Sequence, residues 1–148
     1  MTLEQSHSYW VQVFSVETWN EFIHAGASTT GFRLSRWGYL QKVKPGDYLL
    51  CYLSRVSCWV GVLEAQSDAY LDNTTRIWRG EVYPCRLDVR LLRSLPVERA
   101  VPIRELADRL SIFKRPRWNF HLIGSPTRWK EEDAKAVIEA IDRAADLS

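Results

Sequence analysis

The segment KVKPGDYLLCYLSRVSCWVGVLEA, residues 42–65, constrains the fold of this chain more than any other. It contains a Pro-Gly turn followed by two apolar runs, residues 48–53 and 58–65. Apolar runs of this length between turn signals are typical of buried strands. The loop 54–57 lacks the Asn-Gly signal of a tight hairpin, so pairing of the two runs is predicted from their apolar pattern alone. We therefore expect two paired strands here.

Two further strands and four helices are expected in the rest of the chain. Residues 9–14 form a short apolar run, and in residues 83–91 apolar and polar side chains alternate, as in a strand with one solvated face. Thr18 and Glu21 have the spacing of a capping box, and Pro102 suits a first helical position. Helices are predicted at residues 15–25, 37–43, 102–110 and 130–145. Strands mixed with a few peripheral helices predict an α+β domain whose sheet is curled or closed.

The composition is that of a soluble domain. With 148 residues, 46% of them apolar and 26% charged, the chain fits a single domain over residues 1–148. No apolar run reaches the about 18 residues of a membrane span, and the N-terminus lacks the pattern of a secretory signal. The three cysteines, an odd number without a CxxC pair, are expected to be reduced and buried. We therefore expect a cytoplasmic protein.

The sequence lacks the motifs of the common catalytic and metal sites. It has no phosphate-binding loop and no GxGxxG, GxSxG or HExxH motif, and its three histidines are isolated. A zinc site needs ligand pairs at short spacing, which the cysteines and histidines do not provide. The sequence therefore predicts neither a metal nor a cofactor.

Seven tryptophans are many for so small a chain, and some of them stand beside arginines. Trp78 lies between Arg76 and Arg79 in the polar segment 67–80, which we expect to be a loop. Aromatic faces stack on bases and arginines hold phosphates, so this combination favours a nucleic-acid site.

Each aromatic residue also has a simpler interpretation as part of the core. Trp10 and Trp19 lie on apolar faces and are expected in the core. Trp59 begins a strand and fits either the core or a pocket. Trp78 has few apolar neighbours in sequence, so an exposed, functional position is expected for it. Phe32, alone in the small polar loop 25–35, gives a weaker signal of the same kind.

Basic residues gather in two segments of the chain. Residues 114–130 carry five Lys and Arg and no acid, and residues 33–55 carry five against one Asp. The C-terminal segment 131–148 is acidic. Such an asymmetry fits an ordinary solvated surface, and it is also the electrostatic footprint of a nucleic-acid partner.

Four segments, in this order and spacing, resemble an EVE domain, a member of the PUA-like group that also includes the YTH domains. They are YWVQVF followed by Ser15 and a helix, KVKPGDYLLCYL, WVGVLEA with a later DAYLDN, and RWNFHLIGSPTRWKEED. The resemblance covers residues 9–141. It implies a PUA-like fold, a small and strongly curved mixed β-barrel with peripheral helices. It also implies a binding module without catalysis or cofactor that reads a modified base, often modified cytosine in DNA for EVE domains and methylated adenine in RNA for YTH domains.

The resemblance places a pocket between the end of the first strand, the turn at Gly31 and the loop that carries Trp78. Trp78 stands where YTH domains have a cage tryptophan. Thr30 replaces an expected aromatic residue, so Phe32 would have to provide that wall of the cage. The implied base-binding residues are Ser15, Thr30, Phe32, Trp59 and Trp78. The implied contacts to the nucleic-acid backbone come from Arg33, Arg36, Arg79, Lys114, Arg115 and Arg117. The implied partners are DNA or RNA with a modified base, and other proteins of a modification-dependent restriction or RNA-modification system.

Two other functions stay open at this point. ASCH domains, another PUA-like branch, include RNA-binding proteins and small amidohydrolases that act on acylated cytidine. Such hydrolysis needs a converging nucleophile and base, for which the chain offers Thr29, Thr30, Lys42 and Glu64. Alternatively, the aromatic surface binds a protein. A concave pocket favours the ligand-binding functions, and a flat aromatic patch favours the protein contact.

Overall fold

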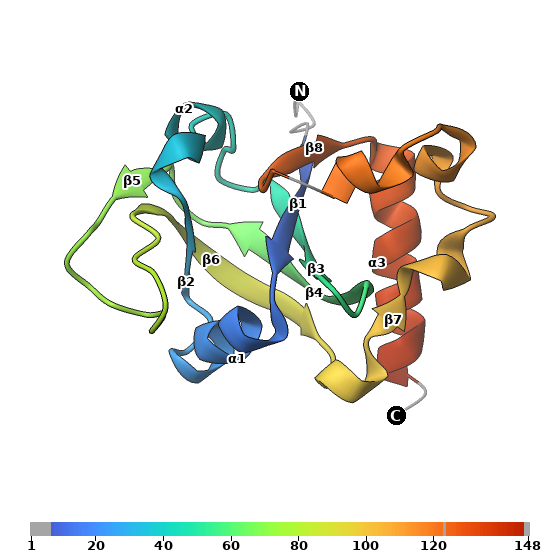
Figure 1. Ribbon diagram of the computed structural model, residues 1–148, viewed down its shortest axis with the longest axis horizontal. Helices are drawn as coiled ribbons and strands as arrows, with labels where there is room; N and C mark the ends of the chain where they lie inside the picture. The colour runs from blue at the N-terminus through green and yellow to red at the C-terminus, as the bar shows by residue number, and fades with distance from the viewer. Residues whose placement is uncertain (1–6, 123, 147–148) are drawn as a thin grey trace, which may run out of the picture.

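The computed structural model describes residues 7–122 and 124–146, and the strands of these residues form one strongly curved mixed sheet (Figure 1). The order along the sheet is β2-β6-β4-β3-β1-β8, with β5 paired to β6 and β7 paired to β4. The strands are β1 (Tyr9–Phe14), β2 (Thr29–Phe32), β3 (Tyr48–Leu53), β4 (Cys58–Ala65), β5 (Tyr70–Leu71), β6 (Cys85–Ser94), β7 (Val101–Pro102) and β8 (Thr127–Trp129). The helices are α1 (Val16–His24), α2 (Trp37–Leu40) and α3 (Glu131–Asp146). Short 3₁₀ turns are η1 (Leu34–Arg36), η2 (Val97–Arg99), η3 (Ile103–Leu106), η4 (Ser111–Lys114) and η5 (Trp118–Leu122).

The predicted strand pair is confirmed, because β3 and β4 have the predicted bounds and pair antiparallel. The first strand also has its predicted bounds, and it pairs in parallel with β3 from Tyr9↔Tyr48 to Phe14↔Leu53. The ladder between β3 and β4 shifts register at Cys51/Tyr52, and that between β4 and β6 shifts at Val62/Leu63. Such irregularities bend strands and increase their twist, which accounts for part of the curvature.

Some predictions about local structure were wrong. The polar segment 25–35 contains β2, whose residues pair with β6, so tertiary pairing gives strand structure to a sequence without a strand pattern. The helix predicted from Pro102 is only the 3₁₀ turn η3, because Pro102 itself pairs with Cys58 in the sheet. Helix α2 ends at Leu40, earlier than predicted.

The capping box of α1 lies three residues earlier than predicted. Ser15 is the N-cap, its Oγ accepts from the backbone N–H of Thr18, and the Thr18 hydroxyl accepts from the backbone N–H of Ser15. The Glu21 carboxylate, assigned to the box by sequence spacing, instead accepts from the backbone N–H of Arg79 at 3.0 Å. The cap therefore starts α1 directly at the end of β1.

Two hydrophobic clusters lie on opposite faces of the sheet. Trp10 and Phe14 on β1 belong to the first cluster, with Trp19 of α1 and Trp78, whereas their neighbour Val11 belongs to the second. The second cluster is covered by α3, which lies to the right of β1, β3 and β4 in Figure 1, with α1, β2 and α2 to their left. Trp10 and Trp19 are buried, as predicted. Across the described residues, none of the helices is both long and apolar enough to span a membrane.

The cysteines lie in the strands, as their apolar neighbours suggest. Cys51 and Cys85 are buried, Cys58 is partly buried, and all three are free thiols. Burial raises the pKa of each thiol, since the charged thiolate loses hydration there. These cysteines behave as small apolar residues of the core.

Candidate functional site

A cavity of about 450 Å³ opens where the curled sheet brings β2 close to β1, although the two strands are far apart in the strand order. Its walls come from the end of β1, the start of α1, β2 with η1, the loop between β5 and β6, and the turn at 124–125. The lining residues are Gln12, Val13, Phe14, Thr18, Gly31, Phe32, Arg33, Ser35, Arg36, Trp78, Tyr83, Gly124 and Ser125. This volume is typical of small-molecule sites, which measure about 300–1,000 Å³.

Of the five residues predicted for the base pocket, two line this cavity: Phe32 and Trp78. Ser15 lies outside it, because its hydroxyl caps α1. Thr30 is fully buried, and its hydroxyl accepts from the side chain of Gln12. Trp59 lies in the cluster on the other face of the sheet, 5.2 Å from Trp129 between ring centroids, so the prediction that it lines the pocket was wrong.

Trp78 is a cavity wall but is not the exposed side chain that the sequence predicts. Only 2% of its surface is exposed, because the 72–84 loop folds back over α1 and the indole Nε1 donates to the carbonyl of Thr18 at 3.1 Å. A Cβ on residue 31 would lie 2.8 Å from Trp78 Cζ3 and 2.8 Å from the carbonyl oxygen of Tyr83. The indole edge therefore occupies the space that only glycine leaves free in β2.

Tyr83 is a further aromatic residue in the cavity wall, and the sequence analysis missed it. It is half-buried, and its ring stands perpendicular to that of Trp78 with centroids 5.1 Å apart. Burial raises the pKa of the Tyr83 hydroxyl, and the nearby Glu81 carboxylate adds to the shift. The alternating pattern from residue 83 onward assigned Tyr83 to a strand, and only the folded chain shows that it precedes β6 and faces the cavity.

Arg86 anchors the loop that carries both aromatic walls. The alternation in β6 assigns it to the solvated face, but the side chain is 1% exposed, because the 72–84 loop covers it. Its guanidinium donates to the carbonyls of Tyr83 (3.1 Å) and Thr75 and pairs with Asp72 at 3.4 Å. The same group lies 6.0 Å from the centroid of Trp78. These bonds hold the loop, and with it the cavity wall, against the sheet.

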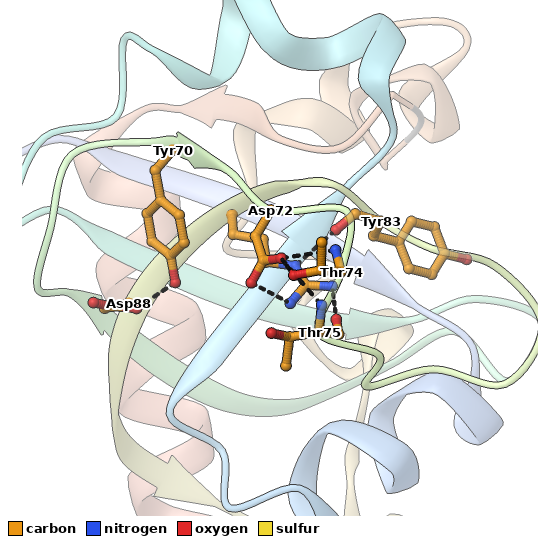
Figure 2. Close-up of polar contacts among 7 residues, drawn as sticks. Tyr70, Asp72, Thr74, Thr75, Tyr83 and Asp88 are labelled. Carbon is orange, nitrogen blue, oxygen red and sulfur yellow. Dashed lines mark hydrogen bonds and ion pairs between the residues drawn. The ribbon is translucent and has the colours of Figure 1, made fainter.

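Asp72 organises the start of this loop (Figure 2). Its Oδ1 accepts from the backbone N–H groups of Thr74 (2.9 Å) and Thr75 (3.1 Å) and from the Thr74 hydroxyl (2.9 Å). These hydrogen bonds stabilise the carboxylate and hold the pKa of Asp72 well below its usual range. Figure 2 also shows Tyr70 reaching Asp88 of β6, at 2.6 Å between hydroxyl and carboxylate oxygens.

Two of the predicted cations stand at the cavity. Arg36 donates to the carbonyls of Gly124 (2.9 Å), Ser125 (3.2 Å) and Pro126 (3.0 Å), and it lies 4.7 Å from the ring centroid of Tyr39. In the part of the chain that the structure describes, no carboxylate pairs with Arg36, so a fixed positive charge lies at the rim. Arg33 is exposed and pairs with Glu81 at 3.3 Å.

The remaining predicted cations do not line the main cavity. Arg79 is exposed, and its backbone N–H binds Glu21. Lys114 and Arg117 lie in and after η4, both exposed, and Arg117 has a positive φ of 60°. Arg115 lines a separate cavity of about 130 Å³ together with Arg128, Lys130 and the buried Asp133. The structure therefore divides the predicted basic residues between at least two places.

Gln12 of β1 places a polar group at the cavity, within an otherwise apolar strand. It is 2% exposed, and its Nε2 donates to Thr30 Oγ1 at 2.6 Å and to the Gly31 carbonyl at 3.3 Å. These bonds join β1 to β2, which do not pair with each other in the sheet. The single Gln in YWVQVF was a signal that the sequence analysis did not use.

The chain is similar to known proteins in sequence and in fold. No family model matches the chain. A UPF0310 protein of Pyrococcus abyssi is 27% identical over 147 residues, which cover 90% of this chain and 99% of the relative. The YTH domain of Pho92, solved in complex with m6A, matches 95% of this chain and 87% of its own, with a TM-score of 0.70 and 16% identity. The chain has the fold of the YTH domains. The YTH domain of Zygosaccharomyces rouxii MRB1, solved in complex with N6-methyladenosine RNA, matches 95% of this chain and 90% of its own, with a TM-score of 0.68 and 17% identity.

This YTH-type fold does not bring the candidate hydrolytic residues together at the cavity. None of Thr29, Thr30, Lys42 and Glu64 is among the lining residues. Lys42 lies 5.0 Å from the ring centroid of Tyr39, and Glu64 pairs with Arg90 at 3.0 Å. Among the described residues, no group of three or more His, Cys, Asp or Glu side chains is placed to hold a metal ion.

Proposed function

We propose that the chain is a nucleic-acid-binding module that takes one modified base out of its stack and holds it in the cavity between β1 and β2. The observation that carries this proposal is the cavity itself, with aromatic walls and an unneutralised arginine at its rim. The YTH domains of the same fold, solved with m6A or with N6-methyladenosine RNA, support a base as the ligand.

The chemistry of the walls fits a flat ring. Phe32, Trp78 and Tyr83 give apolar and aromatic surface, and stacking on an aromatic side chain is worth about 1–3 kcal/mol per base. Extruding a base costs a few kcal/mol, so stacking must offset most of that cost. Because Trp78 is nearly covered, the half-buried Tyr83 offers the more accessible aromatic surface.

The charge at the rim fits a sugar-phosphate backbone. Arg36 is held in place by three carbonyls, so a phosphate near it meets a preorganised cation. Arg33 also lines the cavity, and the exposed Lys114 and Arg115 are proposed as further phosphate contacts outside it. Phosphate contacts position a nucleic acid, whereas contacts in the pocket select the base.

We further propose that the module is an EVE domain and that its ligand is a modified cytosine in DNA. The sequence resemblance supports this assignment, and the UPF0310 relative, matched over nearly its whole length, fits a small single domain of the same kind. The module would then act through the proteins of a modification system that use it to find their target. No observation favours hydrolysis, for which the candidate residues lie away from the cavity.

The proposed function is tested by titrating the protein with labelled oligonucleotides that carry one 5-methylcytosine or one cytosine, single- or double-stranded. We expect tighter binding of the modified strand. The affinity should fall as salt rises, with a slope of about −0.7 to −0.9 in log K per phosphate contact. The double variant Lys114→Glu/Arg115→Glu should flatten this slope. If the protein binds none of these oligonucleotides at low salt, the proposal is overturned.

A further inference from the structure

The hydrogen bonds of Gln12 fix the orientation of its side-chain amide, and so they show which atom donates and which accepts. Its Nε2 lies 3.3 Å from the Gly31 carbonyl oxygen, an atom that can only accept a hydrogen bond. Turning the amide over would place two carbonyl oxygens against each other. Nε2 therefore faces β2, and both of its hydrogens are used by Gly31 and Thr30.

The other end of the amide has no partner. Gln12 Oε1 is one of two buried side-chain polar atoms among the described residues that make no hydrogen bond, the second being Trp59 Nε1 on the other face of the sheet. Buried polar atoms are paired in most structures, because an unpaired one has lost its hydrogen bonds to water. Gln12 lines the cavity, and because Oε1 itself is covered, a ligand that supplies the missing donor has to displace the side chains that lie over it.

We propose that Gln12 Oε1 reads the exocyclic amino group of the bound base, so that the cavity takes amino bases, the cytosine and adenine class, and rejects keto bases such as thymine and uracil. This inference rests on the proposed function and names the ligand class of the same cavity. Cytosine N4 and adenine N6 donate hydrogen bonds, whereas the O4 of thymine or uracil accepts them. A keto oxygen beside Oε1 leaves two acceptors facing each other with no proton between them.

Whether a modified base binds should depend on whether its exocyclic amino nitrogen keeps a hydrogen to donate. A methyl group on carbon 5 of cytosine leaves both N4 hydrogens in place, so the contact with Oε1 persists. A base whose amino nitrogen carries two methyl groups has no hydrogen to donate. It should be rejected as strongly as a keto base, even though its ring stacks equally well.

The test compares four oligonucleotides of one sequence that carry 5-methylcytosine, thymine, cytosine or N4,N4-dimethylcytosine at a single position, with a fifth strand that is abasic at that position as the reference. 5-Methylcytosine and thymine both carry the 5-methyl group, and they differ only on the edge with the amino or keto group. We expect the wild-type protein to bind the 5-methylcytosine strand at least about tenfold more tightly than the thymine strand, the scale of losing one hydrogen bond and leaving its partner unpaired. The dimethyl strand should bind like thymine.

The variant Gln12→Met keeps a side chain of similar length and removes the acceptor. It should bring the ratio of the affinities for the 5-methylcytosine and thymine strands close to one. The melting temperature is measured in parallel. A loss of stability alone lowers the affinity for both strands and leaves the ratio unchanged. Gln41→Met, at an exposed glutamine outside the cavity, is the matched control and should keep the wild-type ratio.

The outcomes separate this inference from the proposed function. Equal wild-type affinity for 5-methylcytosine and thymine, both well above an abasic strand, overturns the inference and leaves the base-binding function standing. If Gln12→Met keeps the wild-type ratio, the role assigned to Gln12 is overturned. Binding of all four strands no better than the abasic strand overturns the proposed function itself. The wild-type comparison needs no variant, so it decides the amino preference even if Gln12→Met does not fold.

Discussion

The indole edge of Trp78 fills the space that the missing side chain of Gly31 leaves in β2, with Cζ3 2.8 Å from where a Cβ would stand. The contact joins a loop residue to a strand 47 positions earlier in the numbering and completes one wall of the cavity. Gly31→Ala must therefore move the indole or the backbone of Tyr83. Trp78→Ala would remove a core residue and a wall at once, which makes Gly31 the sharper place to test the wall.

We expect Gly31→Ala to lower the free energy of unfolding by about 1–3 kcal/mol, the usual cost of overpacking. It should also weaken oligonucleotide binding, because the displaced indole narrows the cavity. Circular dichroism melts and titrations measure the two effects. Gly38→Ala is the matched control, since nothing lies within 4 Å of an added Cβ there. Wild-type binding and stability for Gly31→Ala would mean that Trp78 does not pack on β2 as described.

Tyr83 and Trp59 should separate binding from stability. Tyr83→Leu removes the accessible aromatic wall, so we expect binding to weaken about tenfold or more with a modest loss of stability, about 0.5–1.5 kcal/mol for its ring pair with Trp78. Trp59→Phe should lower the melting temperature while the folded protein keeps its affinity, because the ring lies in the opposite cluster. Both variants are titrated with oligonucleotide and melted in parallel. Loss of binding in Trp59→Phe together with wild-type binding in Tyr83→Leu would contradict the prediction.

Arg86→Met should loosen the 72–84 loop. The substitution leaves the carbonyls of Thr75 and Tyr83 without their donor, so we expect the free energy of unfolding to fall by about 1–3 kcal/mol. Hydrogen exchange in the loop should rise more than in β3 and β4. Arg90→Met on the exposed side of β6 serves as the control and should leave the loop unchanged. A loop that stays protected in Arg86→Met would show that other contacts hold it.

Stability should depend on pH through Asp72. Because hydrogen bonds from Thr74 and Thr75 lower the pKa of Asp72 in the folded state, the carboxylate stabilises the fold above its unfolded-state pKa of about 3.9. That contribution is lost as the pH falls through the lower folded-state value. The difference in unfolding free energy between wild type and Asp72→Asn should thus be constant near neutral pH and shrink below about pH 4. A difference that grew on acidification would contradict the assigned direction.

The sequence predicted the elements whose apolar pattern is complete within one segment. β1, β3 and β4 have their predicted bounds, and α3 covers Glu131–Asp146, close to the predicted 130–145. β2 could not be found in this way, because TTGF acquires its strand structure from pairing with β6 more than 50 residues later.

The candidate site was predictable only in part, for a related reason. Phe32, Trp78, Arg33 and Arg36 line the cavity; large aromatic residues in polar loops indicated the first two, and the family resemblance implied the two arginines. The burial of Trp78 and the roles of Tyr83 and Gln12 depend on a loop closing over α1 and on a sheet curling until β1 meets β2. These are contacts between distant segments, which local pattern does not encode. Trp59 was misplaced because alternation along β4 does not reveal which face of a curved sheet holds the cavity.

The parallel pairing of β1 with β3 also has a consequence for the order of folding. β3 and β4 are neighbours in sequence and close a short loop, whereas Tyr9↔Tyr48 and Thr29↔Asp88 must close much longer ones. Long closures carry a greater entropy cost and slow folding. The cavity exists only after both long pairings have formed, so an early species with the β3–β4 hairpin has no pocket. Ligand binding during refolding would therefore report the last stage of assembly rather than the first collapse.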